Sequence, residues 1–183
     1  MNYTIFNEDH LKDEEIEETV VRVKAFVMNL KNEILVASSN GGIQLVGGHV
    51  EKEEEQVKAL KREIKEETGI EVSDEEISEP FYEVRHYIKN YFNTSKNVIA
   101  KMIYYVVKTT KIPDLSQTKL TKQEQDYDFC LKFIPYFEFE DYVDSFLKSE
   151  KKINGLIASE MKVVFQELKK LKGEEKEWMS ILT

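Results

Sequence analysis

Three closely spaced glutamates are the side chains of this sequence best placed to do chemistry. Glu63, Glu66 and Glu67 are spaced i, i+3 and i+4, so on a helix their carboxylates project from one face. Like charges this close repel each other unless they are solvated, or unless a hard divalent cation that prefers oxygen ligands binds among them. The spacing alone therefore leaves two interpretations, a solvated acidic helix face or a metal site.

The wider pattern favours the metal site. From residue 48 the sequence reads G-x5-E-x7-R-E-U-x-E-E-x-G-U, where U is a bulky aliphatic residue. Its defined positions are Gly48, Glu54, Arg62, Glu63, Ile64, Glu66, Glu67, Gly69 and Ile70. This pattern resembles the signature box of the Nudix hydrolase family at every defined position, and the resemblance is tight over residues 47–70. The sequence departs from the family at Val46, where many members have a proline, but this is not a metal-binding position.

The resemblance implies a set of metal ligands. In the family, the glycine carbonyl and the glutamates of the box bind magnesium, which transfers here to Gly48, Glu63, Glu66 and Glu67. Mn²⁺ is a substitute that the same oxygen ligands would accept. A glycine also suits position 48 because a side chain there would obstruct a backbone carbonyl that faces a cation.

The resemblance also implies a reaction, the hydrolysis of a diphosphate linkage in a nucleoside diphosphate attached to another moiety X. Metal-activated water attacks phosphorus, and a general base must take a proton from that water. Glu67 is the preferred base and Glu63 the other candidate in the box; a later loop offers Glu124, Asp126 and Asp128. The alternative function, from a different class, is a nucleotide-binding Nudix-like sensor or regulator without turnover.

Three further residues receive supporting roles. Arg62 can fix a carboxylate through a bidentate ion pair, and Glu54, two helical turns earlier, is its expected partner, so both orient the box. Arg62 is also counted with Glu63 and Glu67 in the catalytic set. Some dinucleoside-polyphosphate hydrolases of the family carry a tyrosine a short distance downstream of the box, which makes Tyr87 a weak candidate for substrate binding.

The elements that must position these residues follow from the hydrophobic pattern. Val57, Leu60 and Ile64 recur at helical spacing and predict a helix over about 54–68, ended by Gly69. Apolar Val23 and Ala25 alternate with other residues as in a strand. Further strands are predicted at 34–37, 79–87, 98–107 and 129–134, and helices at 138–148 and 156–171.

These elements predict an α+β fold, an α/β/α sandwich with a mixed β-sheet between helices, which is the Nudix fold. Residues 1–183 form one domain, with an acidic N-terminal lead-in at 1–18 and a C-terminal helical extension at about 138–172. Four of the seven glycines, at 41, 42, 47 and 48, mark a place where the backbone turns tightly or approaches another group closely.

The amino-acid composition excludes some classes of binding partner. With 26 Lys and Arg against 35 Asp and Glu, the net charge of −9 argues against a nucleic-acid polymer or an anionic membrane as partner. We expect a cytoplasmic protein without a membrane span, whose partner is a small nucleotide derivative. Residues 154–172 are expected either to form the surface of a homodimer or to pack on the core of their own chain. The single cysteine, Cys130, excludes an intrachain disulfide and is expected to be buried. The nucleobase, the moiety X, the number of metal ions and the oligomeric state are left open.

Overall fold

The computed structural model describes residues 1–39, 41–120, 122, 128–148 and 152–174. Its strands are β1 (Asn2–Phe6), β2 (Glu18–Met28), β3 (Glu33–Ser39), β4 (Gly42–Leu45), β5 (Tyr82–Ile88), β6 (Val98–Lys108) and β7 (Cys130–Pro135). Its helices are α1 (Gln56–Thr68), α3 (Phe139–Asp144) and α4 (Lys152–Glu174), with short 3-10 turns at Asp13–Glu15, Asp74–Glu76, Tyr91–Asn93 and Leu115–Gln117.

The strands form one mixed sheet in the order β1-β5-β6-β2-β3-β4, with β7 paired to β3. The β1–β5 and β2–β6 pairs are parallel, whereas β5–β6, β2–β3, β3–β4 and β3–β7 are antiparallel. Beyond β4 the chain pairs with β2 at two isolated bridges, Ala25 with Val46 and Arg22 with His49. The glycine loop between these bridges is therefore fixed against the middle of β2.

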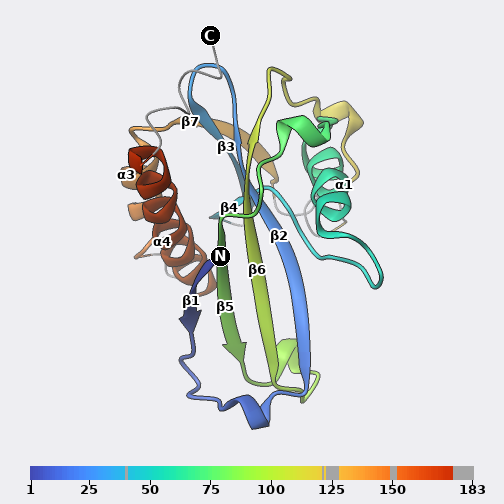
Figure 1. Cartoon of the computed structure of the whole chain (residues 1–183), viewed down its shortest axis with the longest axis vertical. Coiled ribbons are helices and arrows are strands. Elements are labelled where there is room, and N and C mark those ends of the chain that lie inside the picture. Colours follow the sequence, from blue (N-terminus) through green and yellow to red (C-terminus); the bar gives the residue numbers. More distant parts are fainter. Residues whose placement is uncertain (40, 121, 123–127, 149–151, 175–183) are drawn as a thin grey trace.

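Helices cover both faces of the sheet, α1 on one side and α3 with α4 on the other (Figure 1). Alternate residues of β2 enter two separate cores. Val23 and Ala25 pack with Leu60 of α1, whereas Phe26 packs with Phe165 of α4. The predicted sandwich with a mixed sheet between helices is confirmed.

Helix α1 has the buried face and the C-terminal end that its sequence indicates, but it begins at Gln56, so Glu54 precedes the helix. Leu60 and Ile64 are fully buried, and Val57 packs against the same core. The helix ends at Gly69, whose left-handed backbone (φ 74°) a residue with a side chain adopts only with strain; its N–H donates to the carbonyl of Lys65 at 2.9 Å.

Several elements differ from expectation. The acidic lead-in contains β1, which extends the sheet by pairing with β5. Helix α3 ends at Asp144, and α4 begins at Lys152, four residues before the predicted start. The expectation that Cys130 is buried is wrong, because it begins β7, which pairs with β3 alone, and its side chain is exposed beside Ser38. Among the described helices, none is long and apolar enough to cross a membrane.

Candidate active site

Arg62 is the centre of the ion-pair network on α1. Its guanidinium donates to both carboxylate oxygens of Glu54 at 2.9 Å, to Glu63 at 2.7 Å and to Glu66 at 3.3 Å. It also donates to the backbone carbonyl of His49 at 2.8 Å. These bonds raise the pKa of Arg62, and the bond from Arg62 lowers the pKa of Glu54. The expected bidentate pair with Glu54 is thus present, and Arg62 ties the helix to the glycine loop.

Gly48 lies directly against the carboxylate of Glu63. A Cβ atom at position 48 would stand 2.4 Å from that carboxylate, so a residue other than glycine would displace it. The carbonyl of Gly48 accepts a hydrogen bond from the N–H of Val23 at 2.9 Å. Because a carbonyl oxygen has two lone pairs, that bond still leaves capacity for a second partner.

Glu67 is buried on the other side of the glycine loop. Its side chain is only 6% exposed, and its Oε2 accepts a hydrogen bond from the N–H of Gly47 at 3.0 Å. Lys24 donates from the opposite side to the carbonyls of Gly47 and Leu45. Burial lowers the pKa of Lys24, while the negative charge of Glu67 opposes that shift. Glu67 and Lys24 therefore hold the loop at residue 47 between them.

The donor chemistry of the site fits a hard divalent cation. The Gly48 carbonyl and the carboxylates of Glu63, Glu66 and Glu67 are all oxygen donors, which Mg²⁺ and Mn²⁺ prefer. Within the described ranges, however, no group of three carboxylate, imidazole or thiol side chains is already arranged as a metal site. Glu63 and Glu66 each accept a hydrogen bond from Arg62, so a cation that binds them would share their carboxylates with that guanidinium.

Two further predicted residues, Asp128 and Tyr87, lie just before β7 and on β5, on other elements than the network of α1. Asp128 is exposed, with a left-handed backbone (φ 52°), just before β7. Glu124 and Asp126 lie outside the described residues. The hydroxyl of Tyr87 donates to Asp13 at 2.7 Å, and this hydrogen bond raises the pKa of the phenol. The part of Tyr87 in substrate binding stays a prediction.

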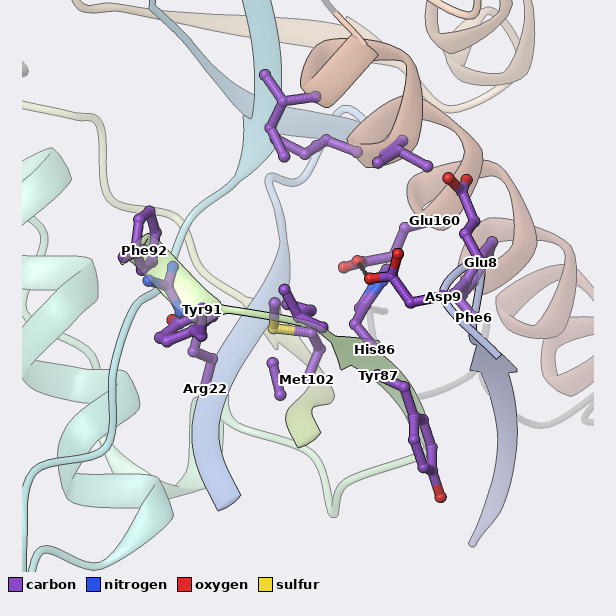
Figure 2. A pocket seen from close by; sticks show the side chains of 15 residues that line it. Phe6, Glu8, Asp9, Arg22, His86, Tyr87, Tyr91, Phe92, Met102 and Glu160 are labelled. Atoms are coloured by element: carbon purple, nitrogen blue, oxygen red, sulfur yellow. Dashed lines mark hydrogen bonds and ion pairs between the residues drawn. The ribbon is translucent and has the colours of Figure 1, made fainter. Parts of the chain in front are cut away.

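A cavity of about 590 Å³ lies on the α4 face of the sheet, bounded by β2, β5, β6, the end of β1 and the first turns of α4 (Figure 2). Arg22 is in its wall and pairs on β2 with His49, the residue after Gly48. Arg22 therefore connects the wall of the cavity, through the backbone pairing of β2, to the residue that follows the glycine loop. Partial burial, together with the positive charges of Arg22 and Lys24, lowers the pKa of His49.

Arg22 and Lys24 are site residues that the sequence analysis did not identify. Both lie on the face of β2 that α4 covers, the face that also carries Phe26. In the sequence both read as the polar residues of an alternating strand, and only the position of α4 over that face shows that Lys24 is buried.

Comparisons with known proteins agree with this fold. The NUDIX domain family matches residues 18–153. Among solved structures, a MutT protein from Methanosarcina mazei is 20% identical, with a TM-score of 0.50 over 88% of this chain and 98% of that one. A MutT protein from Bacillus halodurans is 19% identical, with a TM-score of 0.50 over 67% of this chain and 72% of that one. No curated protein matches the sequence.

The family match spans most of the chain and includes the complete box, so the protein belongs to the Nudix family. It is a Nudix-type pyrophosphohydrolase, and members of this family act on small nucleotide derivatives.

Proposed function

We propose that the protein is a metal-dependent hydrolase that cleaves the diphosphate linkage of a nucleoside diphosphate joined to another moiety X. The observation that supports this most strongly is the arrangement around residues 47 and 48. Glu67 is bound to the N–H of Gly47, Glu63 lies against Gly48, and Arg62 joins Glu63 to Glu54. A domain that only binds nucleotides has no need for carboxylates crowded in this way.

In this proposal, Gly48, Glu63, Glu66 and Glu67 hold the Mg²⁺, and Mn²⁺ can replace it. When bound, the cation polarises phosphoryl oxygens and lowers the pKa of a water molecule. Glu67 takes the proton from the attacking water as general base, with its carboxylate oriented by Gly47.

The diphosphate is positioned by cations of this chain. Arg22 is in the cavity wall, and Lys24, two positions further along β2, is buried and donates to the carbonyls of Gly47 and Leu45. Their charges attract the phosphates that the acidic protein, with a net charge of −9, would otherwise repel. The proposed substrate therefore lies with its diphosphate between Arg22 and the box, and with one end in the cavity.

A turnover screen tests the function. Nucleoside diphosphate derivatives, dinucleoside polyphosphates and oxidised nucleoside triphosphates are incubated with the protein in Mg²⁺, in Mn²⁺ and in chelator. We expect cleavage of at least one compound, with metal, into products on either side of a diphosphate linkage. Metal-dependent binding of the compounds without any cleavage would instead favour the sensor or regulator.

Metal binding should also stabilise the fold, because a cation that binds only the native state raises the free energy of unfolding by RT ln(1 + [L]/Kd). At metal concentrations about 100 times the Kd this amounts to about 2.7 kcal/mol. We expect thermal melts to shift upward in millimolar Mg²⁺ or Mn²⁺ relative to chelator.

Variants of glutamates in and next to α1 test whether the metal-dependent shift in melting temperature comes from the proposed site. Glu63→Gln combined with Glu66→Gln should abolish the shift, whereas Glu55→Gln should keep it, because Glu55 is exposed and pairs only with Lys58 among the described residues. A midpoint that metal leaves unchanged in the wild type would mean that these glutamates are a solvated acidic face.

A further inference from the structure

Glu160 is a buried carboxylate in the wall of the cavity, far from the metal-binding glutamates in the sequence. It lies on α4 and is only 7% exposed. Its Oε1 accepts a hydrogen bond from the hydroxyl of Tyr104 on β6, and its Oε2 pairs with Nε2 of His86 on β5. These two partners fix the orientation of the carboxylate, and the proposed hydrolysis does not use it.

Glu160 can accept further hydrogen bonds from a ligand in the cavity. An ionised carboxylate has about four acceptor positions and no donor, and Tyr104 and His86 occupy two of them. A ligand group that meets the remaining positions must therefore donate. A ligand carbonyl at the same place would face the oxygens of a buried carboxylate and would have no donor there.

The rest of the cavity suits a flat ring. Phe6 stacks on His86 with 5.0 Å between ring centroids and 13° between the ring planes, and Met102 is also in the wall. Tyr91 and Phe92 lie on the Arg22 side of the cavity (Figure 2), and Phe92 is 77% exposed. Aromatic rings on which a base can stack contribute to binding any nucleobase.

The distribution of charge around the cavity determines the orientation in which a nucleotide binds. Glu8 and Asp9 lie on the same side of the cavity as Glu160, and Arg22 lies on the opposite side, toward α1 (Figure 2). A phosphate is repelled from the acidic side and attracted to Arg22. A nucleotide therefore binds with its base toward Glu160 and its phosphates toward the box.

Much of this cavity lies outside the stretch that the family shares. The NUDIX match covers residues 18–153, whereas Phe6 precedes it and Leu156, Ile157 and Glu160 follow it. Glu160 therefore lies beyond the family match, whereas its partners His86 and Tyr104 lie within it.

We propose that Glu160, held by His86 and Tyr104, selects nucleotides whose base offers two adjacent N–H donors, the arrangement on the edge of guanine. This inference rests on the proposed function for the orientation of the phosphates. The N1–H and the 2-amino group of guanine can both donate to one carboxylate, which is a charge-assisted pair of hydrogen bonds. Adenine and cytosine offer an amino group next to a ring acceptor, and uracil offers one N–H between two carbonyls.

The test is a binding series on the intact chain in chelator, by isothermal titration calorimetry. The probes are guanosine, inosine and 1-methylguanosine 5′-monophosphates, which contain no diphosphate linkage and are not consumed. Inosine lacks the 2-amino group, and 1-methylguanosine lacks the N1–H. We expect guanosine monophosphate to bind about tenfold or more tightly than either of the others, because each loses a hydrogen bond to a charged group.

Two variants complete the design. Glu160→Gln keeps the shape but offers one acceptor and one donor, so the preference for guanosine monophosphate should fall below about threefold. Glu167→Gln is the matched control, since it is on the same helix and pairs with Lys170 outside the cavity; it should keep the wild-type preference. Melting curves show whether each variant is folded, and the wild-type series decides the matter even where Glu160→Gln does not fold.

The outcomes separate this inference from the proposed function. Wild-type protein that binds none of the three nucleotides, or binds all three within about twofold, overturns the role of Glu160, whatever the turnover screen shows. A folded Glu160→Gln that keeps the wild-type preference overturns it as well. Selective binding of guanosine monophosphate without turnover of any compound supports the inference while the proposed hydrolase function fails.

Discussion

Glu67→Gln should lower kcat by about 100-fold or more while changing KM much less. The substitution removes a charge that we assign both to general-base catalysis and to metal binding, and each role contributes about 10² or more to the rate. The amide oxygen of glutamine can still accept the hydrogen bond from the N–H of Gly47, so the loop should keep its position. Steady-state kinetics with a substrate from the turnover screen measure the effect.

The control for this experiment is Glu55→Gln, a change of the same type at an exposed position just before α1. It should leave kcat within about twofold and should leave the melting midpoint unchanged. Wild-type turnover in Glu67→Gln would remove Glu67 from the mechanism. Glu63, or the loop with Glu124, Asp126 and Asp128, would then become the source of the base.

The sequence was sufficient to predict the box because its contacts are local. Glu54, Arg62, Glu63 and Glu66 are joined by helical spacing and by one short loop, so the residue types and their order are enough to place them together. The fold class followed from the same kind of pattern, since strands and helices each have their own hydrophobic period. The glycine at 48 was also predictable, although its contact with Glu63 appears only in the structure.

The cavity could not be predicted, because its wall depends on long-range packing. His86 and Glu160 are separated by 74 positions, and nothing in either local pattern indicates that α4 lies over β5. The same reason applies to Lys24, which reads as the polar residue of an alternating strand. It is buried because α4 covers that face, and its hydrogen bonds to Leu45 and Gly47 compensate part of the cost.

Residues that hold the glycine loop belong to two separate elements, β2 and α1. Lys24 reaches it from β2, Glu67 from α1, and the backbone of Val23 from the adjacent position on β2. The stability of the fold and the geometry of the proposed metal site are therefore coupled at residues 47 and 48. A change that moves this loop should reduce both.

Gly47→Ala should be the most destabilising single substitution in the box loop. The backbone at Gly47 has φ 128°, a conformation that residues with a side chain rarely adopt, and a Cβ atom there would stand 2.2 Å from the carbonyl oxygen of Val23. Strain and overpacking together should lower the free energy of unfolding by roughly 2–5 kcal/mol. Chemical denaturation, followed by circular dichroism, measures the change.

Gly41→Ala is the matched control, because Gly41 also has a positive φ, at 73°, but a Cβ atom there meets no atom within 4 Å. Only the backbone strain applies at that position, at a cost of about 1–2 kcal/mol. The difference between the two variants therefore measures the close approach of the loop to β2 together with the greater backbone strain at φ 128°. Because Gly47 also donates to Glu67, Gly47→Ala should lower kcat in the folded protein, whereas Gly41→Ala should not. Equal destabilisation by the two variants, with wild-type kcat in both, would show that the loop can move away from Val23 without displacing Glu67.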